Sequence, residues 1–148
     1  MAHRQTDAIE VKQAAGKGLG VFARRPIREG EEIERVPVIV VAAGEVGDVT
    51  GWTGLAGYCF HWGRDKVALA LGYGSLYNHS TRPNARYDDV GRRTKVFTAI
   101  RDIEPGEEIT VSYNGDPDDD SPVGFKVVES PIPKRPARSP SGRGRARR

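Results

Sequence analysis

Side chains that bind ligands or backbone groups gather in residues 72–86, where Asn78, His79 and Ser80 are followed by Pro83 and Asn84. Asn, His and Ser side chains all form hydrogen bonds readily. Next to Gly and Pro, such a cluster is typical of a bent, hydrogen-bonded segment rather than a regular helix or strand. Taken alone, the segment is either a satisfied turn or a binding site.

A second segment suited to a ligand is rich in glycine. Glycine occupies positions 16, 18 and 20, with Lys17 and Leu19 between them, and an apolar stretch follows at once. This composition leaves the backbone flexible and open to close approach. The segment matches neither the phosphate-binding loop nor the dinucleotide fingerprint, because no helical pattern follows it. On its own it is more simply a hairpin turn, with a ligand-binding turn as the alternative.

Short strands must position these two segments. Apolar patterns predict strands near residues 8–12, 36–42, 66–71, 93–100 and 108–113. The continuous β-branched run at 36–42 predicts burial on both faces of that strand. Helical periodicity is nearly absent, and a single short helix has room only within residues 44–63. The expected fold class is therefore mainly β, with small sheets and little helix.

One internal similarity links two distant turns. Residues 25–33 and 101–109 share six of nine positions, including the motif Gly-Glu-Glu-Ile at the end of each. Two copies are too few for a repeat protein. The similarity predicts one kind of turn used twice, in which glycine shapes the turn and isoleucine begins a strand.

Charge divides the chain into two parts. Residues 1–115 hold 15 basic and 15 acidic side chains, so the formal charge of +3 comes from residues 116–148. That tail changes from acidic to rich in Pro and Arg, and we expect it to be disordered. Its basic end is either a tether to nucleic acid or a solvated tail.

Length and cysteine content limit the remaining possibilities. A chain of 148 residues predicts one domain. Cys59 is the only cysteine, which excludes an internal disulfide and a cysteine-based zinc site. The N-terminus has no signal-peptide core, and no apolar run reaches the roughly 18 residues of a spanning helix. We expect a cytoplasmic protein with no membrane partner, with association to a nucleoid or chromatin as an option.

Three segments together carry a family resemblance: residues 16–23, residues 77–84, and residues 106–113, which end in Tyr113. In order and separation they resemble the SET domain of protein-lysine methyltransferases, in the minimal form found in bacteria and viruses. The resemblance covers about residues 7–115 and leaves residues 116–148 as a tail. The Cys-rich segment that follows the domain in many members is absent.

The resemblance implies a cofactor and the residues that bind it. In this family a glycine-rich turn lies along S-adenosylmethionine, and the matching residues here are Lys17, Gly18 and Leu19. The family's Asn-His pair contacts the same cofactor, which assigns Asn78 and His79. By the same resemblance, the Pro-Asn dipeptide at positions 83 and 84 fixes the bend.

The resemblance also implies a reaction. Tyr113 would contact the cofactor beside its methyl group and act in catalysis, with Tyr58 as the candidate aromatic residue of the lysine channel. The activity would be methyl transfer, without a metal, to the ε-amine of a lysine in a histone-like, ribosomal or other basic protein. The implied fold is a set of several short curved sheets with a C-terminal pseudoknot.

Two questions stay open at this level. Phe125 is the only aromatic residue after Tyr113, so the site is closed by Phe125 folding back, by a second subunit in a homodimer, or by the substrate. The alternative to an enzyme is a binding module for cofactor or peptide that has weak or no turnover and is tethered by the basic tail.

Overall fold

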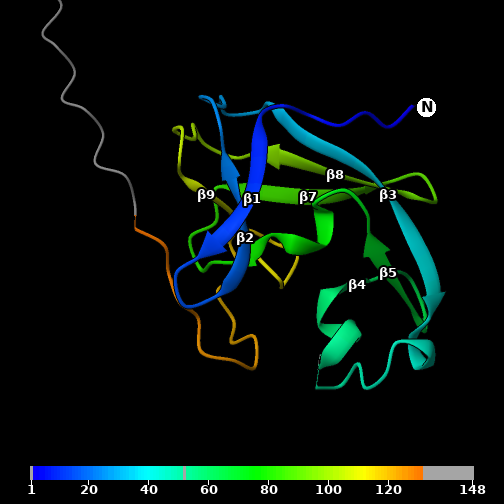
Figure 1. Cartoon of the computed structure of the whole chain (residues 1–148). Coiled ribbons are helices and arrows are strands. Elements are labelled where there is room, and N and C mark those ends of the chain that lie inside the picture. Colours follow the sequence, from blue (N-terminus) through cyan, green and yellow to red (C-terminus); the bar gives the residue numbers. More distant parts are fainter. Residues whose placement is uncertain (1, 52, 132–148) are drawn as a thin grey trace, which may run out of the picture.

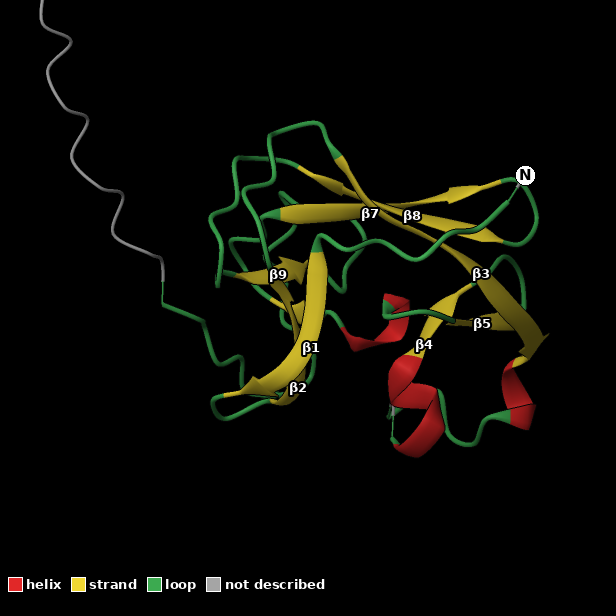
Figure 2. Cartoon of the chain, turned by 45° about the horizontal axis from the view of Figure 1, so that its top comes forward, coloured by secondary structure: helices red, strands yellow, loops and turns green. Residues whose placement is uncertain are grey.

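The computed structural model describes residues 2–51 and 53–131, and these form two β-sheets with no α-helix among them (Figure 1). The expectation of a mainly β chain is confirmed. The β1–β2 hairpin and the β4–β5 hairpin lie at opposite sides of the molecule, as both views show (Figure 2). No helix in the described part of the chain is long and apolar enough to cross a membrane.

The first sheet contains the glycine-rich hairpin. Its strand order is β1 (Ile9–Ala14), β2 (Gly18–Ala23), β9 (Glu108–Val111) and β6 (Asn78–His79). Strands β1 and β2 are antiparallel, and the turn between them has φ of +73° at Gly16 and +79° at Gly18. Side chains rarely tolerate these angles, so glycine is required for this tight hairpin.

The second sheet is antiparallel and has the order β4 (Cys59–His61), β5 (Lys66–Ala70), β3 (Glu32–Ala42), β8 (Thr94–Ala99) and β7 (Ala85–Val90). The long strand β3 pairs with β8 along its first half and with β5 along its second half. A register irregularity lies between Glu32 and Glu34.

The prediction that residues 36–42 are buried on both faces was wrong. Val36 and Val38 are buried, but 49% of the Ile39 surface is exposed. An antiparallel sheet needs cover on only one face, and alternate side chains then meet solvent. The continuous apolar run therefore reflects strand propensity more than two-sided burial.

Three short 3-10 turns complete the described elements: η1 (Ala43–Glu45), η2 (Gly54–Tyr58) and η3 (Gly74–Leu76), drawn red in Figure 2. The turn η2 lies in the region where the sequence allowed one short helix. The turn η3 leads directly into β6. One core of buried apolar side chains draws on both sheets, with Val21 and Ile109 from the first and Phe97 from the second.

The two similar turns pair with each other. Ile27 and Ile103 exchange both backbone hydrogen bonds, at 2.9 and 2.8 Å. The relation is reciprocal, because the Gly30 amide donates to the Ala99 carbonyl and the Gly106 amide donates to the Ala23 carbonyl. The side chains repeat the pattern as well. In each turn an Arg forms a salt bridge with the Glu six positions later, Arg25 with Glu31 and Arg101 with Glu107. These two turns connect inner strands of the two sheets, β2 to β3 and β8 to β9.

Candidate active site

Residues 72–86 and 106–113 meet where strand β6 pairs with strand β9. These strands run parallel, with Asn78 opposite Thr110 and His79 opposite Val111. The buried Asn84 side chain locks the join: its amide donates to the Glu108 carbonyl at 2.8 Å, and its oxygen accepts from the Thr110 amide at 2.8 Å. Residues 72–86 and 106–113 are thereby fixed into one region.

Asn78 connects this region to the glycine-rich hairpin. Its side-chain amide donates to the Leu19 carbonyl at 3.0 Å and to Glu108 Oε1 at 2.8 Å. The other Glu108 oxygen forms an ion pair with Lys17 at 2.8 Å, and both side chains are almost wholly buried. A Cβ on Gly20 would lie only 2.7 Å from Glu108 Oε1. The hairpin, Asn78 and Glu108 therefore form one close-fitting cradle.

His79 and Tyr113 are linked through the backbone. The Tyr113 amide donates to His79 Nδ1 at 2.9 Å, so the neutral ring carries its proton on Nε2. His79 is 4% exposed, and its Nε2 has no hydrogen-bond partner among the described residues. Buried polar atoms normally have a partner, so this N–H is a candidate ligand contact. Burial lowers the pKa of His79, with a smaller opposing effect from the Glu129 carboxylate.

The lowered pKa of His79 predicts a pH dependence of stability. At acidic pH the unfolded chain takes up a proton on this histidine more readily than the folded chain does. The stabilisation that neutral His79 gives to the folded state is complete above the unfolded-state pKa of about 6.5. It is lost as the pH falls toward the lower pKa of the folded state. We expect the unfolding free energy, measured with urea at pH 7 to 5, to fall more steeply for the wild type than for His79→Gln. Equal slopes of unfolding free energy against pH in the two proteins would contradict a lowered pKa of His79.

A cavity of about 260 Å³ lies beside these groups. Its lining comes from the hairpin, from the β6 and β9 region and from the C-terminal segment, namely Gly16, Lys17, Asn78, His79, Tyr113, Phe125, Lys126 and Val128. Four predicted site residues thus share one cavity: Lys17, Asn78, His79 and Tyr113. Gly18 and Leu19 are not in its wall, although the Leu19 carbonyl accepts from Asn78.

Residues 123–131, hereafter the C-terminal strap, lie against this cavity. The Phe125 ring is edge-on to both His79 and Tyr113, with ring centroids 6.2 and 6.0 Å apart. The strap is anchored by Glu129, whose carboxylate accepts from the Ser80 hydroxyl at 2.5 Å and from the Thr81 amide and hydroxyl at 3.0 and 2.9 Å. Of the three ways to close the site, the structure has Phe125 folded back.

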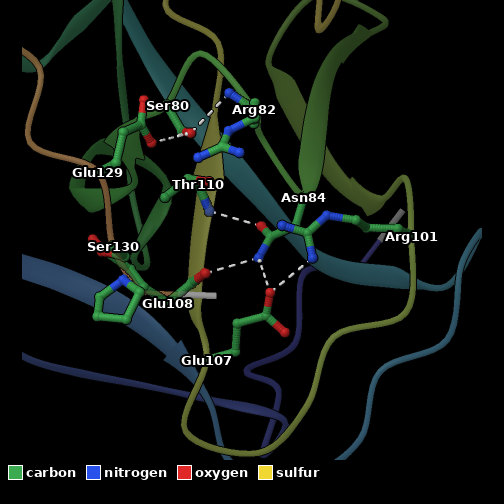
Figure 3. A pocket seen from close by; sticks show the side chains of 10 residues that line it. Ser80, Arg82, Asn84, Arg101, Glu107, Glu108, Thr110, Glu129 and Ser130 are labelled. Carbon is green, nitrogen blue, oxygen red and sulfur yellow. Dashed lines mark hydrogen bonds and ion pairs between the residues drawn. The ribbon is translucent and has the colours of Figure 1, made fainter. Parts of the chain in front are cut away.

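A second, polar pocket lies beneath the join and is shown in Figure 3. Asn84 stands there beside Glu107, which pairs with Arg101 at 2.8 Å, and beside the backbone of Thr110. Its volume is about 20 Å³, which is close to the space that one water needs. This pocket is therefore a hydrogen-bonded joint, and the larger cavity is the candidate ligand site.

The Tyr113 hydroxyl is bound to the backbone just before β6. It donates to the Tyr77 carbonyl at 2.8 Å, and loss of solvation raises its pKa to about 12, with smaller effects from Glu108, Tyr87 and Tyr58. Tyr58 ends η2 and is 53% exposed, outside the cavity wall. The Tyr87 hydroxyl lies 3.7 Å from the place of a Cβ on Gly115, two residues after Tyr113.

The ring of Tyr87 packs against the buried lysine Lys95. Lys95 is 1% exposed, and its ammonium lies 4.4 Å from the Tyr87 ring centroid and 4.2 Å from that of Phe60. Asp89 pairs with it at 2.5 Å. Cation–π contacts of this kind fix both the cation and the rings. Lys95 therefore ties β8 to β4 and β7 through these two rings.

Comparison with known proteins decides the family. The sequence profile of the SET domain matches residues 18–114, about two thirds of the chain. The chain belongs to the SET-domain family of protein-lysine methyltransferases. The matched part of the SET domain runs from the start of β2 to the residue after Tyr113. The predicted family and enzyme class are confirmed.

The relatives of this SET domain carry related names. It is 34% identical over 106 residues to the Schizosaccharomyces pombe "Histone-lysine N-methyltransferase, H3 lysine-37 specific", which covers 71% of this chain and 72% of the relative. It is 32% identical over 95 residues to S. pombe "Histone-lysine N-methyltransferase set9", covering 64% of this chain and 21% of that protein. A crystal structure of a candidate histone methyltransferase from Plasmodium falciparum has a TM-score of 0.60 and 30% identity, over 74% of this chain and 95% of that one. The fold prediction is thereby confirmed at the level of the SET fold.

Sequence reasoning missed several residues of the SET-domain site. Glu108 and Glu129 anchor the cradle and the strap, yet each looked like an ordinary charge in the sequence. Glu108 carried one usable signal, since it belongs to the turn motif that occurs twice. The domain limits of 7–115, the disorder of the tail and the pseudoknot stay predictions, and residues 132–148 lie outside the described part.

Proposed function

We propose that this SET-domain protein transfers a methyl group from S-adenosylmethionine to the ε-amine of a lysine in a histone or another basic protein. The observation that carries the proposal is the cavity shared by Lys17, Asn78, His79 and Tyr113. Both named S. pombe relatives are histone-lysine methyltransferases, which supports a histone as the first acceptor to test.

The cradle fits the proposed cofactor. His79 Nε2–H is a buried donor with no acceptor among the described residues, and an acceptor atom of a ligand would satisfy it. Gly20 has no room for a side chain, so the hairpin backbone packs directly on Glu108 and Asn78 and holds them in place. The backbone of residues 17–19, with Asn78 and His79, would hold the cofactor. When bound, the cofactor supplies the sulfonium methyl group.

Tyr113 orients the acceptor and does not take its proton. Its pKa of about 12 keeps the hydroxyl protonated near neutral pH. The hydroxyl hydrogen is already donated to the Tyr77 carbonyl, which leaves the oxygen lone pairs free to accept from an incoming amine. Fixed orientation of this kind can supply much of the rate enhancement.

The substrate amine must be neutral to react. A free lysine side chain has a pKa of about 10.4, and removal from water lowers it. Enclosure in the cavity beside the Tyr113 ring would remove the amine from water. The proton is released to solvent before the amine is fully enclosed, so activity should rise with pH above neutrality.

The direct test is transfer of label from S-adenosylmethionine to recombinant core histones, followed by mass spectrometry of lysines. Methylated lysine in the histones, or in a mixture of other basic proteins, is the expected result. Binding of S-adenosylmethionine without transfer to any acceptor would favour the alternative, a binding module that does not turn over.

Phe125 is expected to contribute to cofactor affinity. Its ring covers His79 and Tyr113 at the cavity, and loss of an aromatic contact is worth about 1 kcal/mol. We expect Phe125→Ala to weaken S-adenosylmethionine binding about fivefold by calorimetry, since 1.4 kcal/mol corresponds to a factor of ten. Val123→Ala is the control, because Val123 belongs to the same strap but not to the cavity wall. Equal effects of both variants would count against a direct contact.

The basic tail is proposed as a tether to chromatin or other nucleic acid. Seven Lys or Arg residues and no acid lie in residues 132–148, and such segments bind phosphates in a salt-dependent way. Removal of residues 132–148 is expected to reduce DNA binding in a filter assay at low salt. Unchanged DNA binding would leave these residues as a solvated tail. A homodimer stays a prediction, which sedimentation of the full chain can test.

A further inference from the structure

We propose that Glu34 is a positioning residue for methyl transfer, because it fixes through Tyr77 the carbonyl that orients the Tyr113 hydroxyl. Glu34 lies on β3, immediately after the register irregularity, and only 8% of its surface is exposed. It has no ion-pair partner among the described residues. An isolated buried carboxylate is costly, so its persistence here needs a reason.

The Glu34 carboxylate holds both ends of the turn before β6. One oxygen accepts from the Tyr73 backbone amide at 3.0 Å, and the other accepts from the Tyr77 hydroxyl at 2.9 Å. Between these two donors lies η3 (Gly74–Leu76). The fit is close, because a Cβ on Gly72 would lie 2.8 Å from a Glu34 oxygen. A single side chain from another strand thus sets the shape of this turn.

The same turn delivers the partner of the catalytic hydroxyl. Tyr77 is 2% exposed, and its ring stacks on Phe97 with centroids 4.2 Å apart and planes 15° apart. The ring is held by its hydroxyl bond at one end and by this stacking along its face. The Tyr77 backbone carbonyl, on the same residue, accepts from the Tyr113 hydroxyl at 2.8 Å. Two hydrogen bonds, both made by Tyr77, therefore connect β3 to Tyr113.

The two acceptor oxygens of Glu34 matter for this arrangement. A carboxylate offers an acceptor to each of its two donors, whereas a Met side chain of similar length offers at most one weak acceptor. In Glu34→Met, the Tyr73 amide and the Tyr77 hydroxyl would lose the partners that fix their positions. The turn would then shift, and the Tyr77 carbonyl would shift with it. Burial raises the pKa of Glu34, and the bonds from Tyr73 and Tyr77 oppose that rise.

The inference rests on the proposed function for its kinetic test. Glu34→Met and Tyr77→Phe are each expected to lower kcat for histone methylation about tenfold, since small displacements of a reacting group are costly. The dissociation constant for S-adenosylmethionine should stay within about twofold, since a tenfold change would require about 1.4 kcal/mol of binding energy. Glu32→Met is the matched control, because Glu32 is on the same strand with its carboxylate paired to Arg35 at the surface.

A merely structural role is distinguished by coupling to Tyr113. In a Tyr113→Phe background, Tyr77→Phe should have little further effect on kcat, because the hydroxyl that uses the carbonyl is gone. Additive losses in the double variant, or losses of kcat that follow the melting temperature, would overturn the proposal.

A second readout does not depend on activity. In protein with isotopically labelled tyrosine, NMR resolves the ring-carbon resonances. Each resonance can be assigned by changing one tyrosine at a time to Phe, since the chain has five tyrosines. We expect the Tyr113 resonance to move in Glu34→Met and Tyr77→Phe but not in Glu32→Met. An unmoved Tyr113 resonance would overturn the positioning role even in an active enzyme. An inactive wild type with the expected shifts would instead count against the proposed function alone.

Discussion

Tyr113→Phe is expected to reduce the rate of methyl transfer about 100-fold, with little change in the affinity for S-adenosylmethionine. The variant loses only the hydroxyl, which donates to the Tyr77 carbonyl. The backbone amide of residue 113 would still donate to His79 Nδ1, so the cofactor side of the site stays intact. Single-turnover transfer to core histones and calorimetry with the cofactor would separate the two effects.

Two outcomes would contradict this assignment of Tyr113. A loss below about threefold would mean that the hydroxyl does not orient the amine, because one well-placed hydrogen bond is worth about 1 kcal/mol or more. An equal loss of cofactor affinity would mean that the ring acts in binding. Tyr73→Phe serves as a control, since the Tyr73 contact to Glu34 comes from its backbone amide.

Asn84→Ala is expected to lower the free energy of unfolding by about 3 kcal/mol, because two buried backbone groups lose their partner. The Thr110 amide and the Glu108 carbonyl both bond to this side chain, and Asn84 is 1% exposed. For a chain of this size the melting temperature should fall by about 10 °C. Calorimetric or circular-dichroism melting curves would measure the change.

Asn114→Ala is the matched control for the loss of an asparagine. Its side-chain amide donates to the Asp119 and Ser121 carbonyls, in a partly exposed position that water can replace. We expect that variant to lose less than about 1 kcal/mol. A similar loss in both variants would indicate that Asn84 is not the lock of the join.

The sequence predicted the functional segments well because their local chemistry is distinctive. Gly16 and Gly18 have the positive φ that a tight turn demands. The expectation of a bend was wrong for Asn78 and His79, which form the short strand β6, and right for residues 81–82 that follow. Tyr113 was found through the order of three motifs. Local pattern and family resemblance were enough for these residues, since each is tied to a backbone feature.

Partners chosen across the fold could not be predicted. Glu108 meets Lys17 across 91 positions, and Glu34 meets Tyr77 across 43. No local pattern encodes such pairs, because they depend on how the two sheets are joined. Glu129 lies in a tail whose composition predicted no packing, so its contact with Thr81 was not expected. Ile39 was expected to be buried because strand propensity and burial favour the same residue types.

The pairing of the two similar turns sets an order of events during synthesis. Ile27 and Ile103 are 76 positions apart (103 − 27), so at about 5–20 residues per second the first turn waits roughly 4–15 s for its partner. Strand β2 waits as well, because β9 forms its inner neighbour. During that time β2 presents an unpaired edge, which is a hazard for aggregation. Refolding after dilution from urea should take milliseconds to seconds by stopped-flow fluorescence, as for other chains with distant pairings. A chain that ends before β9 would lack both Tyr113 and the strand that closes this edge.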